Sequence, residues 1–347
     1  MGLRIERVSD EAGARDWHYV DSVVVPFDHA GLLADPLEEV VGLLPAGSSA
    51  ERVELSVGYA GARPVGQSIS RLPLRDNTDL ASVIVQVLPD ERRRGYGRAL
   101  LARACESAAA QGRRRVLLEV GAPLGGRSPG EHFAAAMGAC PVLEELRREL
   151  DLASLDAERL ARLAADASAR ADGYERVRWV DRAPADVVAD CAVLIERMAI
   201  DTPMGGTGWQ PELWDVARYR EKEDQAVARG RMRVVTAARH VVSGRVVAYT
   251  DIGISRRQPQ IAYQWDTIVA PGHRGRRLGL LVKLANLELL SRHVPAARSV
   301  QTWNAVANEH MVAINEALGF LAVERSTEWR LDLDAASGDV RPLTARP

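Results

Sequence analysis

Short runs of apolar residues, separated by turn residues, follow one another through the first 151 residues of the chain. Their alternation of apolar and polar positions is typical of β-strands, and it predicts strands near residues 3–8, 52–60, 64–73, 81–88 and 115–121. After the fourth run the spacing becomes helical, with these apolar side chains on one face: Leu100, Leu101, Ala104, Cys105 and Ala108. Strands mixed with helices in this order favour the α/β fold class.

The second half of the chain repeats this order of elements. Its pattern predicts strands near residues 174–180, 231–239, 245–254, 260–269, 299–304 and 327–333. Helices are expected near residues 184–199, 211–229 and 307–318. A further helix should follow the 260–269 strand, with these apolar side chains on one face: Leu278, Leu281, Val282, Ala285 and Leu289.

One stretch of sequence occurs twice at a fixed separation. Residues 85–101 read VQVLPDERRRGYGRALL, and residues 267–283 read TIVAPGHRGRRLGLLVK. Four residue types recur 182 positions apart, as Val87 and Val269, Pro89 and Pro271, Arg92 and Arg274, and Gly97 and Gly279. A constant separation across a strand, a loop and a helix indicates a duplicated domain.

The duplication predicts two tandem domains, the first over residues 1–151 and the second over residues 173–334. Residues 152–172 are rich in Ala, Leu, Arg and Asp and contain neither Pro nor Gly. They predict an interdomain helix that begins at Ser154 or Asp156 as its N-cap.

The charges of the 347-residue chain nearly cancel. Lys and Arg number 45 and Asp and Glu number 47, which gives a net charge of −2. This balance provides no global attraction to nucleic acid or to an anionic membrane. We therefore expect no nucleic-acid partner, and basic residues must act locally.

The ends of the chain and its cysteines favour a cytoplasmic protein. Residues 1–10 are charged and lack the apolar core of a signal peptide, and no apolar run is long enough to span a bilayer. The cysteines at positions 105, 140 and 191 are widely spaced and form neither a metal-binding pair nor an even disulfide framework. Residues 335–347 contain one Gly and two Pro and are expected to be loose.

The duplicated stretch places Arg and Gly between a strand and a helix. The backbone N–H groups of such a loop and the helix N-terminus point at one spot, where a pyrophosphate can sit. In the first copy Gly95 and Gly97 allow close approach of the backbone, and Arg92, Arg94 and Arg98 supply cationic donors. The alternative is an ordinary basic turn whose Arg side chains face solvent.

This Val-x-Pro-x-x-Arg-x-x-Gly-x-Gly pattern resembles the acyl-CoA loop of the GCN5-related N-acetyltransferase (GNAT) superfamily, and the second copy resembles it too. The resemblance covers most of both halves and implies two GNAT-like domains, each a twisted mixed β-sheet flanked by helices. It implies acetyl-CoA as co-substrate, no metal, and two sets of CoA-binding residues: Val87, Arg92, Arg94, Gly95, Tyr96, Gly97 and Arg98, and Val269, Arg274, Gly275, Arg276, Arg277, Leu278 and Gly279. The second copy departs from the pattern at Arg277, where the family has Gly.

Within this resemblance the second half is richer in catalytic groups. Acetyl transfer needs a base for the amine, a donor for the oxyanion and a thiolate that can leave. Asp266 and Tyr263 lie on the strand before the second loop, at positions of opposite parity, and either could reach an amine directly or through water. The corresponding strand of the first half has Gln86 but no acid. We therefore expect catalysis in the second half, and a first half that acts as a scaffold and can still hold CoA.

Each of these two residues also has a structural interpretation. Asp266 could be a strand-end acid that pairs with Arg or solvent, and Tyr263 could be a core residue. Asn304 and Asn308 resemble the amides that hold the pantetheine arm, although Asn at these positions also caps helices. The position of the family's general-acid Tyr is Ala134 in the first half and Asn315 in the second.

The acceptor site is expected to lie beside the Gly-rich loop 201–209 of the second half. An amine would suit Asp201 or Asp251 together with Trp209 or Trp265. The alternative is a connecting loop with one packed Trp.

The expected function is N-acetyl transfer from acetyl-CoA to a primary amine of a small molecule, by a monomer or homodimer. Two alternatives stay open. The acceptor could be a protein lysine or N-terminus, or the chain could be a non-catalytic acyl-CoA-binding module.

Overall fold

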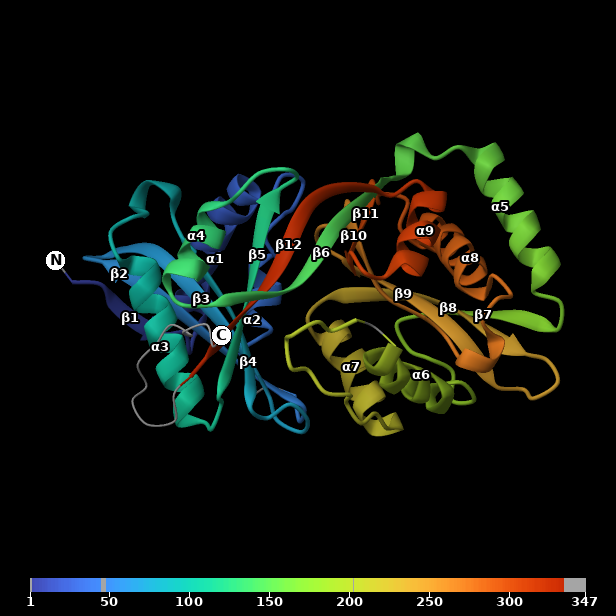
Figure 1. Ribbon diagram of the computed structural model, residues 1–347, viewed down its shortest axis with the longest axis horizontal. Helices are drawn as coiled ribbons and strands as arrows, with labels where there is room; N and C mark the ends of the chain where they lie inside the picture. Colours follow the sequence, from blue (N-terminus) through green and yellow to red (C-terminus); the bar gives the residue numbers. More distant parts are fainter. Residues whose placement is uncertain (1, 45–47, 202, 334–347) are drawn as a thin grey trace, which may run out of the picture. The chain divides into compact units, whose positions relative to one another are not determined.

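The computed structural model describes residues 2–44, 48–201 and 203–333, and these residues form two compact units (Figure 1). The first unit contains the described residues up to 145 together with 204–209 and 324–333. The second unit contains 146–201, 203 and 210–323. The expected α/β fold is confirmed, and the segment 335–347 lies outside the described residues.

The sheet of the first unit is mixed. Its strands lie in the order β1-β2-β3-β4-β5-β12. They have the following bounds: β1 Arg4–Arg7, β2 Glu51–Ala60, β3 Arg63–Pro73, β4 Leu80–Val87, β5 Arg115–Pro123 and β12 Leu321–Asp332. Neighbouring strands pair antiparallel except β4 and β5, which run parallel. Parallel strands need a crossover connection, and helix α3 provides it.

Helices cover both faces of this sheet. They have the following bounds: α1 Glu11–Asp28, α2 Leu37–Val41, α3 Tyr96–Ala110 and α4 Pro129–Ala136. Leu101 of α3 packs with the core on one face, and Trp17 of α1 packs with the core on the other. Asp10 caps the start of α1, and Ser128 forms a capping box with Glu131 at the start of α4.

The second unit repeats this arrangement, with strand order β6-β11-β10-β9-β8-β7. The strands have the following bounds: β6 Cys140–Asp151, β7 Tyr174–Val180, β8 Arg231–His240, β9 Val246–Ser255, β10 Ile261–Val269 and β11 Ser299–Ala305. The helices have the following bounds: α5 Ala157–Arg170, α6 Val188–Asp201, α7 Val216–Ala228, α8 Leu278–His293 and α9 Glu309–Leu318. Leu281 of α8 packs on one face of the sheet, and Ile195 of α6 packs on the other.

The two units do not follow the contiguous division expected from the sequence. The end of β12 belongs to the first unit, where Glu324–Asp332 pairs antiparallel with β5 along its whole length. The end of β6, residues 146–151, belongs to the second unit. Trp329 and Leu331 of β12 complete the core under α3 and α4. Periodicity predicts that a strand exists but not which strand it pairs with, so it assigned each strand to its own half.

Strand β6 escaped the sequence pattern because it is rich in charge. It reads CPVLEELRRELD, yet Arg147 and Arg148 are buried. The Nη1 group of Arg147 donates to Gln301 Oε1 on β11 at 2.9 Å. A buried Arg is tolerated when its donors are satisfied, and such a position does not look apolar in the sequence.

The helix expected between the halves is present as α5. Asp156 is its N-cap, because its side chain accepts from the backbone N–H of Arg159 at 2.9 Å. The helix belongs to the second unit, where Leu160 and Leu163 pack against the α8 core.

The pairing of β12 predicts that residues 1–151 do not fold by themselves. This fragment lacks Trp329 and Leu331, and the loss of large core side chains costs about 2–5 kcal/mol each, a large part of a typical unfolding free energy of about 5–15 kcal/mol. We expect no cooperative thermal unfolding for the fragment. Residues 1–145 joined to 321–333 by a Gly-Ser linker should unfold cooperatively. Equal unfolding midpoints for the two proteins would contradict the prediction.

Candidate active site

The two loops of the duplicated stretch have the same backbone. In the first loop Arg93 and Gly95 are left-handed, with φ of 65° and 85°. In the second loop the residues 182 positions later are left-handed too, Gly275 with φ of 78° and Arg277 with φ of 53°. Gly and Arg have exchanged positions between the two loops, while both positions have kept their left-handed backbone conformation. A left-handed Arg costs on the order of 1 kcal/mol or more, so each loop carries one strained residue.

The helices that follow these loops begin without a side-chain cap. In the part of the chain that the structure describes, no side chain caps the N-terminus of α3 or of α8. Neither helix has an Asp or Glu in its first turn. Side chains do cap other helices, namely α1, α4, α5, α7 and α9. The first-turn N–H groups of α3 and α8 are therefore left for an anion. Tyr96 and Leu278 are the first residues of the two helices.

The equivalent arginines of the two loops form hydrogen bonds to the backbone of their own loops. Arg92 Nε donates to the carbonyl of Val87 at 3.0 Å, and Arg274 Nε donates to that of Val269 at 3.2 Å. Their remaining donors hold carboxylates, Asp28 for Arg92 and Asp201 for Arg274. In this structure both arginines support their loops, and each forms an ion pair with a carboxylate.

The other loop arginines differ between the halves. Arg94 pairs with Glu91, Arg277 pairs with Asp166 of α5, and Arg276 lies over the ring of Tyr174. Arg98 and Arg93 are exposed and have no ion pair within the described residues. The position of Arg98 is Leu280 in the second half. The first loop therefore offers more open positive charge to a pyrophosphate.

Neither Gly97 nor Gly279 is required by packing within the protein. A Cβ at Gly97 would meet the ring of Phe133 at 3.4 Å, and a Cβ at Gly279 would meet Ile314 at 3.4 Å. Both are ordinary van der Waals contacts. Glycine at these positions instead suits the close approach of a ligand to the start of the helix.

The central parallel strands of each sheet part shortly after they begin. β4 pairs with β5 only as far as Val83 and Leu118, and β10 pairs with β11 only as far as Tyr263 and Gln301. Past these points, residues in the middle of each sheet reach solvent. Trp265 of β10 is 51% exposed, and on β4 and β5 Ile84 and Glu119 are exposed as well. Each sheet is thus open between its two central parallel strands, past their last paired residues.

Aromatic rings lie at the open strands of the second unit. Tyr263 stacks between Trp265 and Trp303, with ring centroids 5.9 and 6.2 Å apart. The Trp265 indole lies on the backbone of Gly253, on the sheet face that α6 and α7 cover. β10 is bulged between Gln264 and Thr267. A bulge adds one residue and shifts the parity, so Asp266 comes to the same face as Tyr263 and Trp265.

Asp266 is already engaged by other side chains. Its Oδ2 atom accepts from Lys222 Nζ and from the Tyr249 hydroxyl, each at 3.1 Å. Its backbone N–H donates to Asp251 Oδ1 at 2.9 Å. The sequence suggested a pairing with Arg or solvent, and the partner is Lys222.

Asp251 does not face an acceptor amine in the way that the sequence suggested. Its side chain is fully buried and receives a 2.7 Å hydrogen bond from Arg233 Nη2. Burial favours the protonated acid, but Arg233 and Lys222 hold the pKa of Asp251 below its usual value. Asp201 is likewise paired with Arg274.

The loop expected beside the acceptor site belongs mainly to the other unit. Residues 204–209, with Trp209, lie in the first unit. There Gly206 N–H donates to the carbonyl of Val142 at 3.0 Å, and Arg330 donates to the carbonyl of Gly206. The expectation failed because a long connection can leave the unit in which it begins, and the sequence has no pattern for this.

The asparagines in and after β11 form hydrogen bonds within their own segment. Asn308 caps α9 by accepting from the N–H of Met311 at 3.3 Å. Asn315, which is fully buried, donates to Asn304 Oδ1 at 2.6 Å. Helix capping, the alternative for Asn308, is the role that the structure shows. This hydrogen bond holds the side chain of Asn304 by its oxygen and does not use its N–H₂ group.

The first unit has an acid that the strand pattern missed. Asp21 of α1 is 7% exposed and hydrogen-bonds Gln86, which in turn accepts from Gln67 at 2.7 Å. Burial and the nearby Asp35 raise the pKa of Asp21 to about 7. The sequence did contain a signal, because Asp21 lies on the buried face of α1 with Trp17 and Val20.

More carboxyl groups lie along the open part of β5. His29 Nδ1 lies 2.6 Å from Glu324 Oε1, and both side chains rest on the backbone of Gly121. Although burial opposes its charge, Glu324 raises the pKa of His29. Burial raises the pKa of Glu328 to about 8. No sequence pattern could place Glu324 and Glu328 here, because they come from β12.

Comparisons with known proteins agree with this geometry. Residues 49–128 match the acetyltransferase (GNAT) family. A tandem GNAT protein from the clavulanic acid biosynthesis pathway is 31% identical, with a TM-score of 0.80 over 97% of this chain and 100% of that chain.

The chain belongs to the GNAT family.

More distant GNAT structures share the fold. A GCN5-related N-acetyltransferase from Sphaerobacter thermophilus is 14% identical, with a TM-score of 0.66 over 99% of this chain and 98% of that one. A glucosamine N-acetyltransferase region of a fungal multi-domain GH3 β-N-acetylglucosaminidase is 12% identical, with a TM-score of 0.64 over 95% of this chain and 38% of that one. A search of curated proteins gave no match.

GNAT proteins take the acetyl group from acetyl-CoA, and the tandem arrangement expected from the sequence is confirmed. Among the described residues, no cluster of three or more His, Cys, Asp or Glu could hold a metal ion. No helix in the described ranges is long and apolar enough to cross a membrane.

The two loops predict how CoA binding responds to a negative charge. Gly97→Asp and Gly279→Asp each place a carboxylate at a helix N-terminus that favours the pyrophosphate, and should remove the CoA site of their own half. Calorimetry would measure the stoichiometry. If both halves bind, each variant loses one equivalent. If Gly97→Asp leaves CoA binding unchanged, the first loop is vestigial, and the same holds for Gly279→Asp and the second. Unchanged thermal unfolding is the control for folding.

Proposed function

We propose that this GNAT protein transfers the acetyl group of acetyl-CoA to a primary amine of a small molecule. The observation that carries the proposal is the opening between the parallel strands of each unit, which lies next to an uncapped helix. In each unit the strand that opens runs into the loop and this helix, and an acid lies near the opening. The helix N-terminus suits the pyrophosphate, and the acid suits an ammonium group.

The parted strands also suit the rest of CoA. Backbone N–H and C=O groups that lose their sheet partner past Val83 or Tyr263 need other partners. An extended arm with amide groups can pair with such an open edge as a strand would. One of the open N–H groups can then stabilise the oxyanion that forms when the amine attacks the thioester.

In the second half we propose Asp266 and Tyr263 as the catalytic pair. Tyr263 and its Trp neighbours form a wall that suits the cation of the incoming amine. An amine at Asp266 would take the place of Lys222 as the cationic partner of the carboxylate, which would then accept a proton.

The first half, expected to be only a scaffold, has a second candidate base. Asp21 lies at Gln86 of β4, and within the described residues it forms no ion pair, although the charge of His29 acts on it. With a pKa of about 7 it would be deprotonated in half of the molecules at neutral pH and would be a stronger base than an ordinary carboxylate. We further infer a cytoplasmic monomer or homodimer, in keeping with the free thiols of all three cysteines.

Two variants test which half catalyses transfer. If Asp266 is the base, Asp266→Asn lowers kcat by roughly a hundredfold or more. The matched control is Asp224→Asn, which breaks an exposed ion pair of α7. Turnover would be followed by free-thiol release from acetyl-CoA with a panel of small amines and lysine peptides.

The other outcomes of this assay are distinct. Loss of turnover in Asp21→Asn and not in Asp266→Asn would move catalysis to the first half. Turnover on lysine peptides and none on small amines would overturn the proposed acceptor. CoA binding without turnover on any amine would indicate a binding module.

The raised pKa of Asp21 predicts how stability depends on pH. The folded protein binds this proton more tightly than the unfolded chain, in which the pKa is about 4, so stability falls as the pH rises from about 4 to 7. Asp21→Asn removes this loss. We expect its midpoint of thermal unfolding to exceed that of the parent at pH 8 by several degrees, and by less at pH 5. Glu11→Gln, an exposed carboxylate of α1, should show no such difference. A constant difference at both pH values would contradict the prediction.

A further inference from the structure

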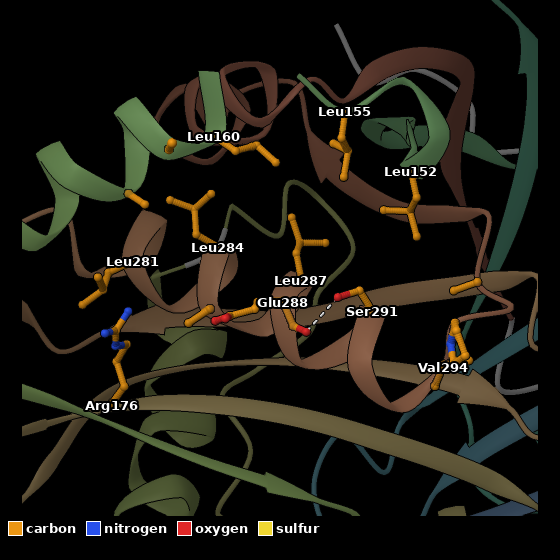
Figure 2. A pocket seen from close by; sticks show the side chains of 15 residues that line it. Leu152, Leu155, Leu160, Arg176, Leu281, Leu284, Leu287, Glu288, Ser291 and Val294 are labelled. Atoms are coloured by element: carbon orange, nitrogen blue, oxygen red, sulfur yellow. Dashed lines mark hydrogen bonds between the residues drawn. The ribbon is translucent and has the colours of Figure 1, made fainter. Parts of the chain in front are cut away.

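A cavity of about 650 Å³ lies between helices α5 and α8 of the second unit (Figure 2). Its walls are mainly aliphatic, with Leu155 and Leu160 on the α5 side and Leu281, Leu284 and Leu287 on the α8 side. Its volume lies in the range of small-molecule sites, roughly 300–1,000 Å³. None of the residues proposed for catalysis lines this cavity.

The cavity exists because α5 packs thinly on α8. Of the residues of α5, all of which the structure describes, Ala167 is the one that is buried. Polar contacts hold the helix instead. Asp166 pairs with Arg277 at 2.8 Å, and Arg159 donates to the carbonyl of Glu316 at 2.9 Å. Leu160 and Leu163 of α5 pack against the α8 core but are only partly buried, and an apolar space left unfilled costs stability.

One positively charged side chain at the cavity, that of Arg176, has no ionic partner within the described residues. Arg176 lies at one end, beside Leu281 (Figure 2). Its guanidinium has no hydrogen bond or ion pair within the described residues, and it is exposed. The carboxylate of Glu288, by contrast, is neutralised by Arg178 at 2.9 Å and by Arg292. The hydroxyl of Ser291 is also used, because it donates to the carbonyl of Glu288.

The far end of the cavity is apolar. Leu152 and Val294 lie there, opposite the end with Arg176 (Figure 2). From Leu281 to Val294 the chain of α8 advances about 20 Å at 1.5 Å per residue. The cavity therefore has a cation at one end and a mainly aliphatic lining, called the channel below, that runs along α8.

We propose that this cavity binds a free long-chain fatty acid, with its carboxylate on Arg176 and its hydrocarbon chain along α8 between Leu284 and Leu160. The charge fits a single anionic head, and the aliphatic walls fit an unbranched chain. The length of the channel favours a long chain over a short one.

The test uses the full-length protein and a fluorescent polyene fatty acid that hexadecanoic acid displaces. We expect saturable binding, and a higher midpoint of thermal unfolding with the acid present. Methyl hexadecanoate should bind at least about tenfold more weakly, because it lacks the charge that Arg176 recognises. Equal binding of acid and ester, or no binding of the acid, would overturn the proposal.

Three variants locate the site. Arg176→Gln should weaken binding about tenfold or more, whereas Arg162→Gln, an exposed Arg of α5 that pairs with Glu158, should not change it. Leu284→Trp should fill the channel and abolish binding without lowering the midpoint of thermal unfolding. Equal affinities for Arg176→Gln and Arg162→Gln would place the ligand elsewhere.

Two further outcomes would also overturn the proposal. If saturating CoA displaced the fatty acid, the hydrocarbon chain would lie in the CoA-binding site and not in this cavity. If light scattering showed a dimer that Leu284→Trp dissociates, a second copy of the protein would be the occupant.

Discussion

The divergence of two parallel strands is the constraint on which the rest of this protein depends. β4 and β5 stay paired as far as Val83, and β10 and β11 as far as Tyr263, after which each pair opens. Backbone groups past these points need partners other than the neighbouring strand. Side chains supply some of them on β10, and a ligand can pair with others. The loop and the uncapped helix at the end of each opening supply the complementary site for an anion.

The two units share one backbone arrangement, but the side chains at their open strands differ in chemistry. The second unit combines a bulged β10, a row of aromatic rings and Asp266 in a partly buried network with Lys222 and Asp251. The first unit has an unbulged β4 and a group of carboxyl side chains, among them Asp21 and Glu324. A duplicated frame can keep its backbone conformation because that conformation depends on few residues, while the side chains around the opening are free to change.

Helix α5 links the proposed fatty-acid cavity to the second loop. Asp166 on α5 pairs with Arg277, which is the left-handed residue at the start of α8. The partners lie at the surface, where such a pair contributes about 0–1 kcal/mol. The contact is therefore more important for where α5 lies than for stability, and it holds the helix above the aliphatic face of α8.

From the sequence we predicted the duplication, most strands and helices, the two loops, and Ser154 or Asp156 as the N-cap of the helix between the halves. Each of these depends on residues close together in the chain, through hydrophobic period, turn chemistry and helix capping. Contacts between distant parts of the chain could not be predicted in this way: β12 completes the first unit, Lys222 neutralises Asp266, and Asp21 lies at Gln86. These contacts join residues far apart in the chain, and their free energy comes from strand pairing and burial, which leave no local period in the sequence.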